Sequence, residues 1–380
     1  MVILSILIIF SYLLLIGSFA FGFDKVKTFH LENKPAKNTF SILIPFRNEA
    51  EHLPELLKSI SQLEYPQYLF EIIFIDDDSD DESVEIIKQV LDTLSQRENT
   101  QTDVKIIKNE RHSNSPKKDA LTSAIKQTKH EWIITTDADC ILPKYWLSSY
   151  DEFIQQNNSK CIVAPVTYNS TNTFLNRFQL LDFLSLQGAT IGGFGINKPF
   201  MCNGANFAYK KSAFNEVGGF EGNSNIASGD DIFLLEKIVK AYPKSIHYLK
   251  SEPAIIITKP QPTWKLLFEQ RLRWASKTSA YSNWFGKLTG VIVLLANALV
   301  LVLALLSVLG VFKLKIFTYL LFIKFNLDFI LIYKTASFFN QKDALLSYIF
   351  AFILYPFFSV YIAFLSTFKT YKWKNRTFRK

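Results

Sequence analysis

The chain has 380 residues, of which 49% are hydrophobic, and its formal net charge is +8. Its three cysteines show no CxxC spacing and its five histidines are scattered, which excludes a disulfide framework and a structural zinc site and indicates a reducing compartment. Much of the positive charge adjoins apolar segments and therefore fits an anionic bilayer surface, not a nucleic acid. The last twelve residues alone contain Lys369, Lys372, Lys374, Arg376, Arg379 and Lys380.

The first predicted element is a membrane anchor. Met1–Phe23 is almost entirely apolar and is long enough to cross the roughly 30 Å hydrocarbon core of a bilayer. A signal peptide is the alternative, but the segment lacks a basic start and a small-x-small cleavage site. Lys25 and Lys27 follow it, so the positive-inside rule predicts that the next domain is cytoplasmic.

Strands and helices are predicted to alternate from about residue 38 to 255. Short apolar runs indicate strands, and apolar residues with a 3.6-residue period indicate helices. The order βαβα predicts an α/β fold with a mostly parallel sheet and helices on both faces. In chain order, the predicted elements are strand Thr39–Pro45, helix Glu51–Leu63, strand Glu71–Ile75, helix Ser83–Leu94, strand Val104–Lys108, helix Asp119–Thr128 and strand Glu131–Thr135.

Two segments of this region carry no clear period. Asn109–Lys118 is polar and is predicted to be a loop. Arg177–Phe200 is rich in aromatic residues and glycine and contains Gly192-Gly193-Phe194-Gly195. No helix signature follows this glycine cluster, so it is not interpreted as a nucleotide-binding loop.

Three further apolar segments follow, Leu288–Phe312, Ile316–Tyr333 and Ala344–Phe368. The middle one contains Lys324 and Asp328, which lie four residues apart and can pair on one face of a helix. Three spans after the N-terminal anchor would place the basic tail outside, against the positive-inside rule. The middle segment is therefore our candidate for a re-entrant or interfacial segment.

Acidic clusters directly follow two of the predicted strands. Asp76-Asp77-Asp78 ends the second strand, and Asp137-Ala138-Asp139 follows the fourth. Ligands of open α/β sheets bind at the carboxyl ends of the strands. There, Asp137 and Asp139 can ligate Mg²⁺ or Mn²⁺, and one acid of the first cluster can accept a hydrogen bond from a nucleobase. For Asp137 and Asp139, the alternative is a turn after the strand. For Asp76-Asp77-Asp78, the alternative is capping of the next helix.

Two later groups add charge of both signs. Lys117 and Lys118 open a helix after the polar loop, where they can attract phosphate; a solvated loop is the alternative. Asp230 and Asp231 precede an apolar helix and can supply a general base for an acceptor hydroxyl, with helix capping as the alternative.

Gln270-Arg271-Leu272-Arg273-Trp274 lies on an amphipathic segment, Trp264–Ala275, just before the C-terminal apolar region. Arginine provides planar donors for diphosphate oxygens, and tryptophan provides a stacking surface for a sugar ring. An interfacial helix with snorkelling arginines is the alternative.

With these motifs in this order, residues from about 39 to 280 resemble the family 2 inverting glycosyltransferases, which share the GT-A fold. The membrane-embedded branch, with cellulose, chitin, hyaluronan and poly-N-acetylglucosamine synthases and ceramide glucosyltransferase, is the most similar. The resemblance implies that Pro45, Glu49, Asp76, Asp77, Lys117, Lys118, Asp137, Arg271 and Arg273 bind the nucleotide-sugar; that Asp137 and Asp139 bind the metal; that Cys202, Gly204, Asn206, Gln270 and Trp274 bind the acceptor; and that Asp231, with Asp230 beside it, acts as the base.

Departures from the family pattern are also present. Asp230 stands where the family has Glu, and Pro116 stands where a Gly is usual. The apolar segments are few for a channel that secretes a long polymer. The motif from Gln270 to Trp274 also occurs in enzymes that glucosylate lipids, so it does not prove repeated transfer.

The sequence thus predicts a multi-pass enzyme of the plasma membrane with a cytoplasmic catalytic domain. We expect an anchor at 1–23, a GT-A domain at 24–287, membrane helices at 288–368 and a basic tail at 369–380. The predicted reaction is sugar transfer from a nucleotide-sugar, with UDP as the expected nucleotide, to a glycan, with Mg²⁺ or Mn²⁺ as cofactor. Transfer of one sugar to a lipid and nucleotide binding without catalysis are the alternatives.

Overall fold

The computed structural model describes residues 1–95, 103–169, 172–224, 226–368, 370–373 and 376–378. The chain forms two compact units. The helical unit comprises Met1–Val26, Tyr168–Phe200 and Pro260–Lys380, and the sheet unit comprises Lys27–Thr167 and Met201–Lys259. Each unit is therefore built from segments that are separated in the sequence.

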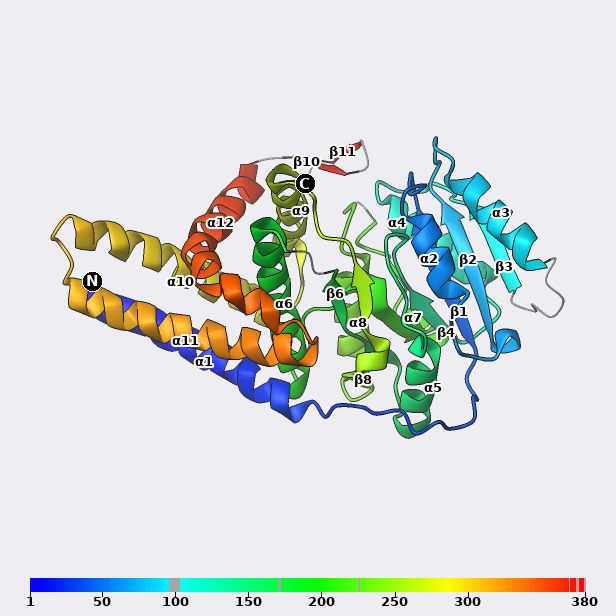
Figure 1. Ribbon diagram of the computed structural model, residues 1–380, viewed down its shortest axis with the longest axis horizontal. Helices are drawn as coiled ribbons and strands as arrows, with labels where there is room; N and C mark the ends of the chain where they lie inside the picture. Colours follow the sequence, from blue (N-terminus) through cyan, green and yellow to red (C-terminus); the bar gives the residue numbers. More distant parts are fainter. Residues whose placement is uncertain (96–102, 170–171, 225, 369, 374–375, 379–380) are drawn as a thin grey trace. The chain divides into compact units, whose positions relative to one another are not determined.

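A seven-stranded sheet forms the centre of the sheet unit, with strand order β3-β2-β1-β4-β7-β5-β8 (Figure 1). Strands β3, β2, β1 and β4 are mutually parallel, β5 is parallel to β8, and β7 is antiparallel to both β4 and β5. The predicted mostly parallel α/β sheet is thus confirmed. The strands are β1 (Phe40–Phe46), β2 (Phe70–Asp76), β3 (Asp103–Lys108), β4 (Trp132–Thr135), β5 (Cys161–Val163), β7 (Phe207–Lys210) and β8 (Ile246–Tyr248).

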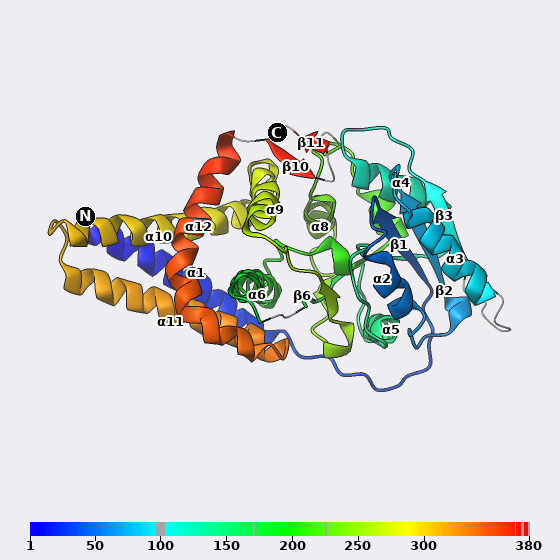
Figure 2. The same ribbon diagram turned by 45° about the horizontal axis from the view of Figure 1, so that its top comes forward.

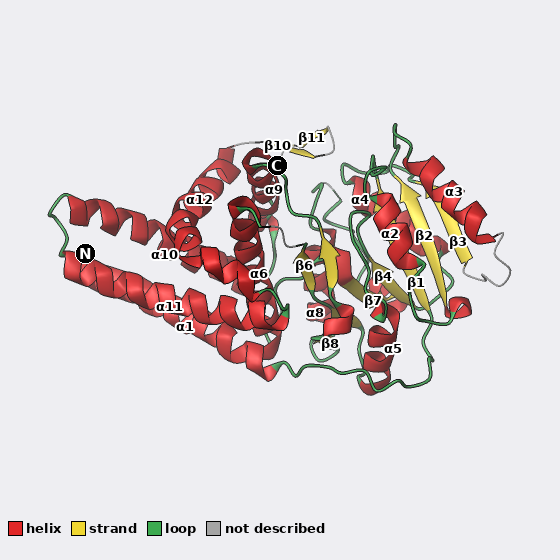
Figure 3. Cartoon of the chain, in the orientation of Figure 1, coloured by secondary structure: helices red, strands yellow, loops and turns green. Residues whose placement is uncertain are grey.

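Helices cover both faces of this sheet because the parallel crossovers are right-handed. The chain moves from β1 to β2 to β3 in one direction and from β3 to β4 in the other, which puts α2 and α3 on one face and α4 on the other. Figure 3 shows α2 and α3 in front of the strands. The helices of this unit are α2 (Leu53–Ile60), α3 (Ser83–Ser95), α4 (Pro116–Gln127), α5 (Trp146–Gln156), α7 (Lys211–Glu216) and α8 (Asp230–Ala241).

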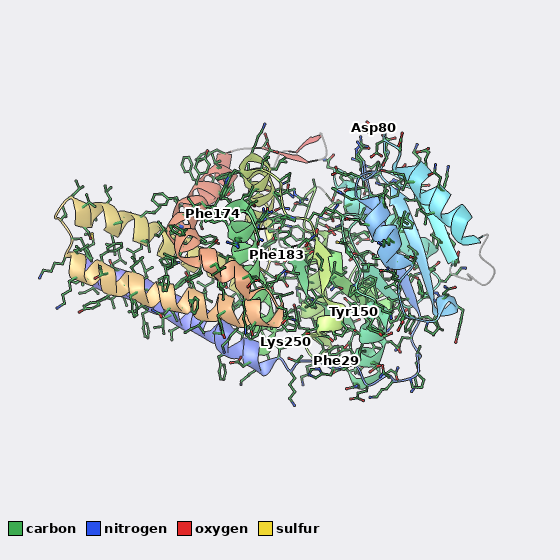
Figure 4. All side chains as sticks on the ribbon, viewed as in Figure 1. Phe29, Asp80, Tyr150, Phe174, Phe183 and Lys250 are labelled. Atoms are coloured by element: carbon green, nitrogen blue, oxygen red, sulfur yellow. The ribbon has the colours of Figure 1, made fainter. Side chains whose placement is uncertain are left out.

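Two buried carboxylates fix the segment that leads from residue 27 to β1. Asp151 accepts a hydrogen bond from the backbone N–H of Asn38 at 2.8 Å, and Glu152 accepts one from the N–H of Glu32 at 2.7 Å. The N–H of Phe29 donates to the carbonyl of Lys250 at 2.7 Å, and Figure 4 shows these two labelled residues in the same region. This connection is therefore held along its length by the sheet unit.

The helical unit contains α1 (Val2–Lys25), α6 (Phe174–Gly195), α9 (Trp264–Ser276), α10 (Trp284–Val308), α11 (Leu314–Phe338) and α12 (Tyr348–Phe368). Helix α1 packs against α6, α10 and α11, and Figures 1 and 2 both show α1 beside α11. Two small two-stranded pairs complete the described strands: β6 (Val166–Tyr168) with β9 (Ile256–Thr258), and β10 (Tyr371–Trp373) with β11 (Arg376–Phe378), the latter antiparallel.

The glycine-rich segment is the end of a 22-residue helix, α6. Its glycines allow α6 to approach α1 closely. A Cβ added at Gly192 would lie 2.3 Å from the carbonyl oxygen of Phe19, and one at Gly195 would lie 1.8 Å from that of Gly22. These glycines therefore serve the close packing of α6 on α1.

Among the described residues, four helical segments are long and apolar enough to span a membrane: Val2–Lys25, Trp284–Val308, Leu314–Phe338 and Lys342–Phe368. Helix α11 runs unbroken for 25 residues, so the re-entrant alternative for this segment is wrong; the interfacial alternative stays a prediction. The predicted pairing within α11 is confirmed, because Lys324 Nζ donates to Asp328 Oδ2 at 2.7 Å. Of the expected basic tail, residues 369, 374–375 and 379–380 lie outside the described residues.

Candidate active site

The acidic cluster after β2 divides between a turn and a buried carboxylate. Asp76 Oδ1 accepts a hydrogen bond from the backbone N–H of Ser79 at 2.9 Å, which forms a turn between β2 and α3; helix capping was the alternative interpretation for this cluster. Asp77 is buried, and its Oδ1 accepts hydrogen bonds from Asn109 Nδ2 at 2.7 Å and from Arg111 Nη1 at 3.2 Å. The carboxylate of Asp77 after β2 and the side chains of Asn109 and Arg111 after β3 thus meet at one end of the sheet.

The segment after β1 lies against the same cluster. Pro45 is paired with Ile75 in the β1–β2 register, and Arg47 Nη1 donates to the carbonyl of Asp77 at 2.7 Å. The backbone N–H of Glu49 donates to Ser83 Oγ at 2.8 Å. The two residues predicted to contact the nucleotide, Pro45 and Glu49, therefore flank the carboxyl ends of β1 and β2.

A lysine links the second acidic cluster to the acids of α8. Lys117 Nζ lies 2.5 Å from Asp137 Oδ1 and 3.6 Å from Asp230 Oδ2. Burial opposes a charge on this ammonium, but the two carboxylates raise the pKa of Lys117 above its ordinary value, so the lysine stays charged. Asp137 and Asp139 both follow β4 in the chain. Asp139 precedes Cys140 and is half-buried. One lysine thus brings two predicted motifs, separated by more than 90 residues in the sequence, into one site.

Asp230 and Asp231 lie in the first turn of α8. The residue before the helix is Gly229, with φ of 83°, so neither acid is the N-cap residue that the alternative interpretation proposed. Asp231 Oδ2 accepts a hydrogen bond from the backbone N–H of Gly204 at 2.9 Å, and its Oδ1 accepts one from the N–H of Ile232 at 2.8 Å. Gly204, predicted on the acceptor side, therefore orients the predicted base.

Lys118 points away from this cluster into the interior of the sheet unit. Its Nζ donates to the carbonyl oxygens of Asn223 at 2.7 Å and Ile226 at 2.9 Å, and it lies 4.8 Å from the ring centroid of Phe233. The side chain is almost fully buried, at 1% exposure. These contacts connect the start of α4 to the loop before α8, so any role of Lys118 in nucleotide binding acts through that loop.

Asn206 is also buried, and its side-chain amide bonds within the protein. Its Oδ1 accepts hydrogen bonds from Trp146 Nε1 at 2.9 Å and Tyr150 Oη at 2.8 Å. Its Nδ2 donates to the carbonyls of Pro165 at 2.7 Å and Ala254 at 2.8 Å. An amide has two donors and two acceptor positions, so these four bonds use its full capacity. The neighbouring Cys202 is half-buried.

The residues after β4 fit a hydrated divalent cation. Among the described residues there is no group of three or more His, Cys, Asp or Glu side chains that could enclose a metal ion. Mg²⁺ is commonly held by one or two carboxylates together with the phosphates of a substrate. Asp137 and Asp139, neither of them fully buried, form such a two-carboxylate set.

The predicted Gln270–Trp274 motif lies on α9, in the helical unit, whereas the acids described above belong to the sheet unit. Arg271 is buried, and its Nε donates to Asp182 Oδ2 at 2.6 Å. Its guanidinium lies 4.2 Å from the ring centroid of Trp274, and its Nη1 donates to Gln270 Oε1. Arg273 is half-buried, so the two arginines have different surroundings.

Three of these residues were missing from the prediction. Asn109 and Arg111 directly follow β3, which neighbours β2, so their position at the carboxyl edge of the sheet was a usable signal. Asp182 lies in a helix with no polar period, and its pairing with Arg271 across 89 residues left no signal in the sequence.

The sequence and the fold are similar to those of known proteins. The model of the family "Glycosyl transferase family 2" matches residues 41–218, and that of "Glycosyl transferase family group 2" matches residues 132–366. The solved mannosyltransferase PcManGT from Pyrobaculum calidifontis, in complex with GDP-Man and Mn²⁺, has a TM-score of 0.52 and 16% identity, over 88% of this chain and 99% of that one. Its likeness supports the fold.

Relatives in sequence also have names of glycosyltransferases or glycan synthases. The probable glycosyltransferase YdaM of Bacillus subtilis is 27% identical over 250 residues, which are 64% of this chain and 56% of the relative. Poly-beta-1,6-N-acetyl-D-glucosamine synthase of Staphylococcus epidermidis is 25% identical over 279 residues, 69% of this chain and 61% of the relative. The matches thus span about three-fifths of these relatives.

The mostly parallel α/β sheet is typical of the GT-A fold, as the resemblance implied. The chain belongs to glycosyl transferase family 2.

Proposed function

We propose that the protein transfers a sugar from a nucleotide-sugar, with UDP as the expected nucleotide, to a hydroxyl group of a glycan, with inversion at the anomeric carbon. The observation that carries the proposal is the bridge made by Lys117 between Asp137 and Asp230. It joins the acids after β4 to the helix that begins with Asp230 and Asp231, so donor-side and base-side groups share one site.

The donor occupies the carboxyl edge of the sheet. Its base lies near Asp77, whose carboxylate accepts hydrogen bonds from Asn109 and Arg111 in this structure. Pro45 and Glu49 flank this position, and Lys117 provides positive charge for the diphosphate. Arg273 of α9 is half-buried and is proposed as a donor for phosphate oxygens, whereas Arg271, predicted for the same role, is buried and engaged by Asp182.

Asp231 is the proposed general base. It accepts the proton of the acceptor hydroxyl, the oxygen forms a bond to the anomeric carbon, and the bond from that carbon to the diphosphate oxygen breaks. The electron pair of the broken bond leaves with the nucleoside diphosphate. The backbone N–H groups of Gly204, at 2.9 Å from Oδ2, and of Ile232, at 2.8 Å from Oδ1, orient this carboxylate and stabilise its charged form.

A divalent cation fits beside this base. Asp137 and Asp139 would hold Mg²⁺ or Mn²⁺, which when bound stabilises the negative charge of the departing diphosphate. Lys117 lies on the same carboxylate of Asp137, so this lysine and the cation share one negative group.

A glycan acceptor is favoured by the name of the poly-N-acetylglucosamine synthase relative. A lipid acceptor is the second candidate, because the four apolar helical segments would keep the enzyme at a bilayer where such an acceptor resides. In both cases Gln270 and Trp274 of α9 are proposed to contact the acceptor.

The same apolar helices support an integral membrane protein of the plasma membrane. Lys25 and Lys27 follow the first of them, which favours a cytoplasmic position for the sheet unit by the positive-inside rule.

The test is nucleoside diphosphate release by the full chain purified in detergent, with Mg²⁺ or Mn²⁺ and a panel of UDP- and GDP-sugars. We expect release with one donor, and its loss in Asp231→Asn and Asp139→Asn. Removal of a general base typically lowers the rate by about 10²–10⁴-fold. Lys34→Gln, at an exposed ion pair with Glu32 in the segment before β1, is the control and should retain activity.

The size and type of the product distinguish the two candidate acceptors. A ladder of oligosaccharides supports a glycan acceptor, and a single glycolipid supports the lipid alternative. Nucleotide binding without any release, in the presence of both membrane lipids and oligosaccharides, would contradict the proposed transferase.

A further inference from the structure

Arg271 is the centre of a buried polar group in the helical unit. The side chains of Arg271 and Asp182 are both only 6% exposed, and Arg271 Nε lies 2.6 Å from Asp182 Oδ2. Arg271 Nη1 also approaches Tyr168 Oη at 3.4 Å and donates to Gln270 Oε1. The residues come from α6, α9 and the end of β6, so the group connects three segments of the chain.

The guanidinium plane is also stacked. It lies 4.2 Å from the ring centroid of Trp274, and that ring packs against Phe183 with centroids 6.3 Å apart. Phe183, labelled on α6 in Figure 4, follows Asp182 directly in the sequence. One turn of α6 therefore contacts both the head of Arg271 and the tryptophan on which that head is stacked.

The two arginines of the motif differ in burial. Among the residues that the structure describes, Arg271 Nη2 is buried and has no hydrogen-bond partner, while the other nitrogens of the group are engaged within the protein. Asp182 compensates the buried charge: Burial opposes ionisation, but Asp182 and Tyr168 raise the pKa of Arg271 above its ordinary value. Arg273 is half-buried and is the more accessible of the pair.

We propose that Asp182 is a positioning residue for the transferase: through Arg271 it fixes the side chains of Gln270 and Trp274 that contact the acceptor. The inference rests on the proposed function. Asp182 touches neither substrate in this scheme. Its carboxylate holds one edge of the guanidinium, so that the opposite nitrogen meets Gln270 and the flat face meets Trp274.

The mechanism predicts a selective defect. Misplacement of a binding group by about 1 Å can lower a rate by about 100-fold. We therefore expect Asp182→Asn, which removes the charge with little change of shape, to raise the KM for the acceptor and lower transfer by about 10–100-fold. The affinity for the nucleotide should stay within about twofold of wild type, because Asp77, near which the nucleobase is proposed to bind, belongs to the sheet unit.

The experiment compares Asp182→Asn and Asp182→Glu with wild-type full-length protein in detergent. The readouts are the acceptor KM, the turnover and, separately, the Kd of the free nucleoside diphosphate. Asp182→Glu keeps the charge and should recover at least part of the acceptor affinity. Asp24→Asn, which removes an exposed carboxylate paired with Lys334 in the same unit, is the matched control and should change nothing.

The outcomes separate the two proposals. If wild-type protein shows no transfer with any acceptor, the proposed function fails before Asp182 is considered. If wild type transfers sugar and Asp182→Asn has the same acceptor KM, Asp182 does not position the acceptor residues and the inference is overturned.

A merely structural role is also distinguishable. In that case, Asp182→Asn would lower turnover and nucleotide-binding capacity in the same proportion, with an unchanged acceptor KM, because only the folded fraction falls. If Asp182→Asn fails to fold, the double variant Asp182→Asn/Arg271→Gln removes both buried charges. It should fold, because an unpaired buried charge is more costly than a neutral pair, and should show the raised acceptor KM. A folded double variant with an unchanged acceptor KM would overturn the inference.

Discussion

Substitution of Gly192 by alanine tests the close packing of α6 on α1. The added Cβ would lie 2.3 Å from the carbonyl oxygen and 2.6 Å from the Cα of Phe19. Both atoms are backbone, so no side-chain rotation can relieve the clash and the two helices must separate. Overpacking of this kind costs about 1–3 kcal/mol. Two backbone atoms clash, so we take the upper end of this range, about 3 kcal/mol. Alanine is favoured over glycine inside a helix by about 1 kcal/mol, which leaves an expected net loss of stability of about 2 kcal/mol.

The assay is thermal unfolding in one detergent at one scan rate, followed by intrinsic fluorescence. Gly192→Ala should lower the midpoint by on the order of 5 °C. Gly17→Ala in α1 and Gly290→Ala in α10 are the matched controls, because an added Cβ at either position meets no atom within 4 Å. Both should melt at or slightly above the wild-type temperature. The same midpoint for Gly192→Ala as for these controls would refute the packing argument.

Three other outcomes are expected. Lys117→Met removes the ammonium that lies on the acid cluster, so Mn²⁺, measured by electron paramagnetic resonance without nucleotide, should bind about tenfold more tightly; unchanged or weaker binding contradicts this. Lys324→Met leaves Asp328 without its cation and should lower stability by about 3–5 kcal/mol, and adding Asp328→Leu should restore most of it, as measured by thermal unfolding; additive losses contradict this. Burial and neighbouring carboxylates raise the pKa of the Cys140 thiol, so it stays protonated near pH 8 and should react with iodoacetamide far more slowly than half-buried Cys202; equal rates, followed by mass spectrometry, contradict this.

The first half of the sheet unit was predictable because its signals are local. The strands β1 to β4 are short apolar runs, and the helices between them have a regular 3.6-residue period, so the predicted bounds agree with those observed to within about three residues. The acids were placed correctly at the ends of β2 and β4 for the same reason: they follow the apolar runs directly.

Helix α6 was not predicted, and the reason is physical. It is apolar on most sides, so it has no polar face from which a period can be read, and its glycines argue against a helix in isolation. The helix is stabilised by packing against α1 and α11, which lie far away in the sequence. The glycine cluster that weakens the local signal is the part of the helix that allows this contact.

Within the candidate site, residue types were predictable but partners were not. Lys117 was expected to face phosphate, and its contacts with the two acidic motifs depend on how α4 and α8 meet at the end of β4. Lys118 stands next to it in the sequence and points into the interior instead, because successive residues of a helix face different directions. Likewise, the sequence does not distinguish Asp182 from other acidic residues, because its pairing with Arg271 depends on the packing of α9 against α6.

The position of α6 in the chain has a consequence for synthesis on the ribosome. Among the strands that the structure describes, β5 pairs with β7 and β8, and both are translated after α6. When α6 emerges, its neighbour α1 has already been made, whereas the sheet still lacks the strand that joins β5 to β4. The sheet unit is therefore completed only after the chain has passed through the helical unit and returned. A soluble sheet unit cannot be obtained by trimming the ends of the gene, because such a truncation would retain residues 168–200 without the helices that cover them.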